Sequence, residues 1–255
     1  MQGLVEVTDL HVRYGDYEAV KGVSFSLGKG EILGIVGESG SGKSTIAKTL
    51  MGLQRPSSGT IKVKGKGDKP SPSPNIQMIF QDAVGSLNPR MTVRQTLDEV
   101  IRHHVSRLSS KVLPASGPET GDGRRQTPES LLDLVGLSQA VLDQYPREMS
   151  GGQCQRVSVA RALACKPEVL VADEPVSALD VSVQARILNL LRDLRMDLGL
   201  SILLIAHDLA VVKNVCDRIC VMEHGLFVDS GLAEDVFDHP QSDYTKRLLS
   251  AVPRI

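Results

Sequence analysis

A glycine-rich loop that ends in a lysine and a serine is the strongest chemical motif in this chain. Gly37 to Ser44 matches the pattern G-x-x-x-x-G-K-[ST] at every fixed position. Glycines let backbone N–H groups turn inward around phosphate oxygens, and the helix predicted over Thr45 to Leu50 points its positive end at the same anion. Lys43 would reach the β- and γ-phosphates, and the Ser44 hydroxyl would ligate Mg²⁺. The residues predicted to bind the phosphates are Gly37, Ser39, Gly40, Ser41, Gly42, Lys43, Ser44 and Thr45.

Two adjacent carboxylates supply the next part of a phosphate-transfer site. Asp173 and Glu174 directly follow the apolar run Val169 to Ala172, which predicts a buried strand. Open α/β sheets bind their ligands at the carboxyl ends of strands. Asp173 would therefore hold Mg²⁺ through water, and Glu174 would orient or deprotonate the attacking water.

Two further polar residues also end predicted strands. Gln81 follows the strand-like run Ile76 to Phe80, and its neutral amide could ligate Mg²⁺ or water. His207 follows the apolar run Ile202 to Ala206 and would meet the γ-phosphate from the far side. The predicted metal ligands are thus Ser44, Gln81 and Asp173, and the predicted catalytic residues are Lys43, Gln81, Glu174 and His207.

A second candidate phosphate cradle lies at Ser150, Gly151, Gly152 and Gln153, just before a predicted helix. Ser150 suits the N-cap position, and the two glycines permit close approach of another group to the backbone. From this feature alone, a plain turn before a helix stays an open alternative.

Predicted strands and helices alternate along the chain around these residues. Val5 to Val12 predicts a strand, and Val23 to Leu27 followed by the turn Gly28 to Gly30 predicts an antiparallel hairpin edge. The runs that are apolar on both faces favour a covered, mostly parallel sheet. Helical spacing begins at Val93, and short helices are predicted over 129–137 and 139–145. Polar Gly/Pro loops are expected over 65–74 and 114–128.

Composition narrows the function classes. The chain has 255 residues, 41% of them hydrophobic and 23% charged, as is typical of a soluble globular protein. A net charge of −1 and the absence of Trp argue against nucleic-acid binding. No apolar stretch is long enough to cross a membrane, and residues 1–7 lack the pattern of a signal peptide, so a cytoplasmic location is expected. The four cysteines form no CxxC pair, which favours buried thiols over a metal site.

Taken together, these motifs resemble those of the nucleotide-binding subunit of an ABC transporter, over nearly the whole chain. Gly37 to Ser44 resembles the Walker A motif, Val169 to Glu174 the Walker B motif, and Gln81 the Q-loop. Ser150 to Gln153 resembles the LSGGQ signature with Met149 in place of Leu, and His207 the switch histidine. Further matches are the D-loop, from Ser177 to Asp180, and the aromatic residue that stacks on adenine, Tyr14.

A closer resemblance is to the ATPases of oligopeptide, dipeptide and nickel importers. It is carried by residues 80–82 and 86–93, by 180–185, and by the tail motifs His239-Pro240, Asp243-Tyr244-Thr245 and 248–253. Ala206 stands where Thr is usual, and Cys154 where a basic or polar residue is common, but neither change removes a catalytic group. Relatives often carry an iron–sulfur cluster in a longer tail, and no such cluster is predicted here.

The resemblance implies a P-loop NTPase (RecA-like) α/β fold with an antiparallel β subdomain and an inserted helical subdomain. The expected ATP-binding core is 1–85 with 167–232, the helical signature subdomain 86–166, and the tail 233–255. ATP and Mg²⁺ would bind between two head-to-tail ATPase subunits, identical or paralogous, so Ser150 to Gln153 would contact ATP held by the other chain. Two transmembrane permease subunits, and indirectly an extracytoplasmic solute-binding protein, would complete an importer at the cytoplasmic face of the membrane.

Two other function classes also have a phosphate loop of this kind. An ABC ATPase that serves a non-transport complex shares the motifs, although the short helical insertion argues against a DNA-repair protein with a long coiled coil. A small-molecule P-loop kinase would have no use for the signature motif.

Overall fold

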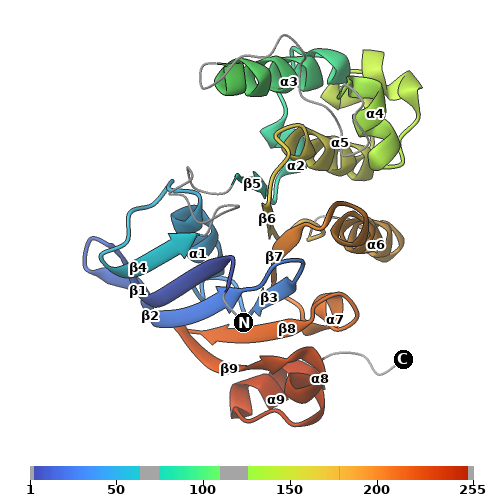
Figure 1. Cartoon of the computed structure of the whole chain (residues 1–255). Coiled ribbons are helices and arrows are strands. Elements are labelled where there is room, and N and C mark those ends of the chain that lie inside the picture. The colour runs from blue at the N-terminus through green and yellow to red at the C-terminus, as the bar shows by residue number, and fades with distance from the viewer. Residues whose placement is uncertain (1–2, 64–74, 110–125, 178, 252–255) are drawn as a thin grey trace.

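The computed structural model describes residues 3–63, 75–109, 126–177 and 179–251 (Figure 1). Within these residues, a three-stranded antiparallel sheet has the order β2-β1-β4, and a six-stranded sheet has the order β5-β6-β7-β3-β8-β9. Neighbouring strands of the larger sheet are parallel, except that β9 pairs antiparallel with β8. The strands are β1 Val5–Tyr14, β2 Tyr17–Leu27, β3 Ile32–Val36, β4 Ser58–Val63, β5 Ile76–Ile79, β6 Val169–Asp173, β7 Ser201–Ala206, β8 Arg218–Glu223 and β9 Leu226–Leu232.

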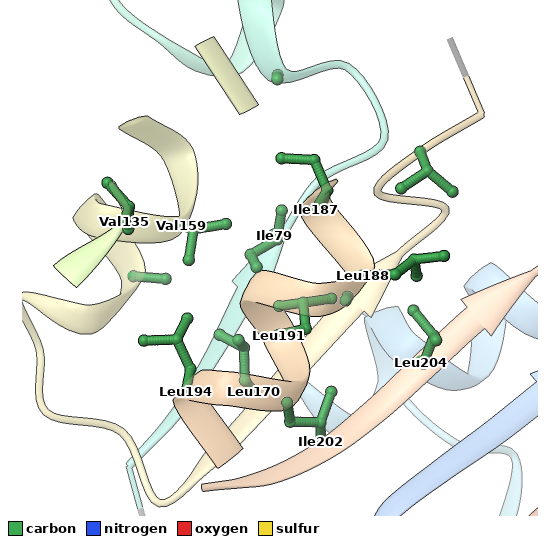
Figure 2. Packing of buried hydrophobic residues seen from close by; sticks show 14 of the residues in the cluster. Ile79, Val135, Val159, Leu170, Ile187, Leu188, Leu191, Leu194, Ile202 and Leu204 are labelled. Carbon is green, nitrogen blue, oxygen red and sulfur yellow. The ribbon is translucent and has the colours of Figure 1, made fainter. Parts of the chain in front are cut away.

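The central strands β3, β6 and β7 are buried along their whole length. Helix α6 (Val181–Leu198) covers one face of the sheet, and Figure 2 shows Ile187, Leu191 and Leu194 among the side chains of β6 and β7. Burying apolar side chains on both faces is what the continuous apolar runs predicted. Because replacing such a leucine with Ala typically costs about 2–5 kcal/mol, this packing holds the strand ends firmly at one edge.

The other face of the parallel sheet packs against the antiparallel sheet. Val7 and Phe25 of the smaller sheet share a buried cluster with Leu33 and Ile205. Helix α1 (Lys43–Leu50) joins the same cluster through Ile46. The phosphate loop, which links β3 to α1, is therefore anchored at both of its ends in one core.

The predicted hairpin edge was right in its antiparallel pairing and wrong in the turn that closes it. β2 pairs with β1, and the turn between Tyr14 and Tyr17 contains Gly15 at φ 59°. The turn at Gly28 to Gly30 leads instead into β3, which pairs with β7 and β8 in the larger sheet. Since β3 is apolar throughout, it is stable only where both of its faces are covered.

The described residues between β5 and β6 form a helical lobe, seen at the top of Figure 1. Leu97, Leu131, Leu142 and Val157 form part of its core. The short helix predicted over 139–145 is a 3₁₀ helix over residues 139–143. The loop predicted over 65–74 lies outside the described residues, as does the loop predicted over 114–128 up to residue 125, and α4 begins at Pro128. The lobe contains α2 Ala83–Ser86, α3 Val93–Ser109, α4 Pro128–Leu134, η1 Gln139–Asp143, η2 Pro146–Glu148 and α5 Gly151–Leu163.

The remaining helices are α7 (Leu209–Val212), α8 (Ala233–Asp238) and α9 (Asp243–Ser250). Helices α8 and α9 follow β9 and lie together at the bottom of Figure 1. Among the described residues, no helix is both long enough and apolar enough to span a bilayer.

Candidate nucleotide-binding and catalytic site

The loop after β3 has the close backbone contacts that demand glycine. A Cβ atom on Gly37 would overlap the carbonyl oxygen of Met222, and one on Gly42 would overlap that of Ala19. Gly40 and Gly42 also have φ of 81° and 111°, which disfavours any residue with a Cβ. Ser39 is exposed beside Gly40, whereas the hydroxyl of Ser41 is buried and has no hydrogen-bond partner among the described residues.

Lys43 begins α1 and is only 3% exposed. Its Nζ atom donates to the carbonyl oxygens of Gly37 at 2.7 Å and Glu38 at 2.8 Å. Burial lowers the pKa of the Lys43 ammonium, and the carboxylates of Glu174 and Asp173 oppose that shift. The loop thus holds a poorly solvated cation beside the start of a helix, where Thr45 also lies, and both features favour an anion.

Asp173 ends β6 next to the phosphate loop. Its Oδ1 atom accepts a hydrogen bond from Ser44 Oγ at 2.9 Å. Burial raises the pKa of the Asp173 carboxyl, while the Ser44 hydrogen bond lowers it. The structure therefore brings together a hydroxyl and a carboxylate oxygen, which are ligands that Mg²⁺ accepts.

Glu174 has a positive φ of 46°, which is uncommon for a residue with a side chain. Its backbone N–H still donates to Ile205 of β7 at 3.0 Å. Gln81 Nε2 donates to Glu174 Oε2 at 3.0 Å, and His207 Nδ1 lies 3.5 Å from the same oxygen. Residues at the ends of β5, β6 and β7 thus converge on one carboxylate, as parallel strands allow.

Ser177 also contacts this cluster, which the sequence analysis did not predict. Gln81 Nε2 lies 3.4 Å from Ser177 Oγ, which in turn donates to the carbonyl oxygen of Glu174 at 3.2 Å. The sequence assigned Ser177 only to the D-loop, and its position three residues after Glu174 is the signal that could have suggested this contact.

The second cradle forms a well-capped helix start away from this cluster. Ser150 Oγ accepts from the Gln153 N–H, and Gln153 Oε1 accepts from the Ser150 N–H. Gly152 packs so closely on Val183 of α6 that a Cβ atom would overlap that side chain. In the part of the chain that the structure describes, no hydrogen bond or ion pair joins residues 150–153 to the phosphate loop or to Asp173 and Glu174.

Two predicted residues stand apart from the carboxylate cluster. Tyr14 lies at the end of β1 and is 45% exposed, so a ligand can reach it. Asp180 is the N-cap of α6, where its Oδ1 accepts from the Val183 N–H at 2.9 Å and from Ser182 Oγ. These hydrogen bonds hold the pKa of Asp180 below its ordinary value, with the Ser182 hydroxyl as the main cause.

The chain matches known proteins over most of its length. The family model described as "ABC transporter" matches residues 20–177. The oligopeptide transport ATP-binding protein OppF of Lactococcus lactis is 46% identical over 244 residues, which are 93% of this chain and 73% of that protein. The structure of cbiO1 from Clostridium perfringens, part of the ABC transporter complex cbiONQ, aligns over 94% of this chain and 92% of its own with a TM-score of 0.75 and 26% identity.

A dimeric structure of the ATP-binding cassette MJ0796, in a post-hydrolysis state with ADP and Pi, aligns over 90% of this chain and 98% of its own, with a TM-score of 0.71 and 26% identity. These matches confirm the expected P-loop fold and the resemblance to peptide-importer ATPases. The chain belongs to the ABC transporter family, as one of its ATP-binding subunits.

Proposed function

We propose that this chain is the ATP-hydrolysing subunit of an importer for peptides or a related small solute. The observation that supports it best is the convergence of Gln81, Glu174 and His207 beside a phosphate loop. The name of the Lactococcus relative indicates the cargo class.

In this proposal the loop binds the phosphates of ATP. Lys43 exchanges its two loop carbonyls for phosphate oxygens, and the backbone N–H groups of residues 40–45 bind the same anion. Tyr14 stacks on adenine. When bound, Mg²⁺ neutralises charge on the phosphates, and Ser44 and Asp173 would hold it, with Gln81 as a third oxygen ligand.

Glu174 orients the attacking water and accepts its proton while a water oxygen bonds to the γ-phosphorus. The bond between that phosphorus and the oxygen bridging to the β-phosphate breaks, which yields ADP and phosphate. His207 lies beside Glu174 and would contact the γ-phosphate oxygens from the side opposite Lys43. Glu174 is largely buried, with 14% of its side chain exposed.

The signature residues act on the other chain. The N–H groups at the start of α5 and the side chain of Ser150 lie in an exposed turn, which among the described residues makes no hydrogen bond or ion pair to the chain's own phosphate loop. They would bind the γ-phosphate of ATP held by a partner ATPase, and Asp180 would lie at the same interface. The dimer of the MJ0796 cassette supports this arrangement.

A membrane permease would dock near residues 86–93, in a segment that follows Gln81. Phe80 and Val84 beside it are 39% and 49% exposed, so apolar surface is available there. Closure of two ATPase subunits around ATP would then reach the permease through the helical subdomain, proposed as residues 86–166, and the chain would sit at the cytoplasmic face of the membrane. A solute-binding protein outside would take part only indirectly.

The test is to isolate the chain from membranes of its own cells and identify the proteins that co-purify with it. We expect two permease subunits, and the complex in proteoliposomes should import labelled peptide only when ATP is present. Purification with soluble proteins alone, with ATP hydrolysis that no membrane component affects, would instead indicate the non-transport class.

A further inference from the structure

Helix α9 is firmly docked against the body of the protein. Tyr244 is 6% exposed and Thr245 is fully buried. Ser242 caps the helix by accepting from the Thr245 N–H, and the carboxylate of Asp229 in β9 accepts from the N–H groups of Gln241 and Ser242. A side chain on the first turn of α9 is therefore held in a fixed position.

That first turn reaches the phosphate loop. The backbone N–H of Glu38 donates to Tyr244 Oη at 2.9 Å, across 206 positions of sequence. The carbonyl oxygen of the same residue accepts from Lys43 Nζ at 2.8 Å and from the Ser41 N–H at 3.2 Å. Glu38 is thus held by the tail helix through its N–H and by Lys43 through its carbonyl.

Neighbouring side chains connect Tyr244 to the end of β8. Arg247, one turn further along α9, places its guanidinium 5.8 Å from the centroid of the Tyr244 ring and 3.5 Å from Glu223 Oε1 at the end of β8. Met222, the neighbour of Glu223, is the residue whose carbonyl oxygen lies against Gly37. The tail helix, the end of β8 and the start of the phosphate loop therefore form one packed unit.

We propose that Tyr244 is a positioning residue for nucleotide binding: its hydroxyl fixes the Glu38 backbone and so orders the start of the phosphate loop before the nucleotide binds. This inference rests on the proposed role of the loop as the phosphate site. The hydroxyl binds an N–H at the start of the loop, ahead of the residues 40–45 that are proposed to bind the phosphates. A loop ordered in advance loses less conformational freedom when the nucleotide binds.

The variant Tyr244→Phe tests this, because it keeps the ring and removes only the hydroxyl. From the net value of one hydrogen bond, ATP binding should weaken about two- to tenfold. The Glu38 amide should also exchange its hydrogen faster in the nucleotide-free protein. Tyr145→Phe, the same change in the helical lobe, is the matched control and should alter neither measurement.

The dissociation constants are measured at a temperature well below the unfolding midpoint of every variant. A lower midpoint for Tyr244→Phe with unchanged ATP affinity would show that the hydroxyl only anchors the tail, and would overturn the proposal. Unchanged exchange of the Glu38 amide would overturn it as well. If the unmodified chain binds no ATP at all, the proposed function itself fails, which separates the two results.

Discussion

The substitution Glu174→Gln isolates the charge of the carboxylate that Gln81 and His207 approach. The amide has the same shape, and its oxygen can still accept the 3.0 Å hydrogen bond from Gln81. It cannot take a proton from water. Because a positioned general base contributes about 10²–10⁴ in rate, hydrolysis should fall by that factor, or about 3–5 kcal/mol in barrier.

The Glu174→Gln variant should still bind ATP. Because it does not hydrolyse the bound ATP, two chains of this variant should stay together as a dimer. Lys43 is the main phosphate contact of the proposal, and removing the Glu174 charge takes a negative group away from the anion. Hydrolysis is measured as phosphate release by the assembled complex, and binding as the affinity for ATP. Dimer formation is measured by size-exclusion chromatography. Glu99→Gln, the same change at an exposed position of α3, is the control. Turnover like that of the unmodified complex would refute the role of Glu174.

Three further outcomes follow from exposure and burial. Tyr14→Ala should weaken ATP and GTP binding by about tenfold each, since every base can stack, and equal affinities in a binding titration would contradict the contact. Burial raises the pKa of Asp173, so its ionised form at neutral pH destabilises the folded state. Asp173→Asn should therefore raise the unfolding temperature of the nucleotide-free protein, while hydrolysis is lost. A clear fall in that temperature would contradict this reasoning. Burial raises the pKa of Cys220 to about 12 and that of Cys216 higher still, so iodoacetamide should label the partly exposed Cys165 first, as read by peptide mass spectrometry.

The sequence predicted best what depends on local burial. The strands β3, β6 and β7 are buried on both faces, so each can be predicted from its own continuous apolar run. The polar residues that follow these runs mark the strand ends. Parallel pairing then brings those ends to one edge, which is why Asp173, Glu174 and His207 could be grouped before the structure. Their catalytic roles stay predictions.

What the sequence could not predict depends on distant partners. The turn at Gly28 to Gly30 has the composition of a hairpin turn, but packing on the larger sheet decides that the chain crosses from one sheet to the other there. The contact between Tyr244 and Glu38 joins segments 206 residues apart. Nothing in either segment alone indicates the other, because the contact is set by how α9 docks on β9.

One working site should need the phosphate loop of one chain and the signature residues of another. The most direct measurement mixes two inactive variants, Ser150→Arg and Lys43→Ala, and follows phosphate release. When the chains pair at random, some dimers contain one chain of each variant. In such a mixed dimer, one site carries both changes and the other site carries neither. We expect hydrolysis to return above that of either variant alone, with ATP affinity of the Ser150→Arg monomer unchanged. Loss of ATP binding by that monomer, together with no recovery on mixing, would contradict a site shared between chains.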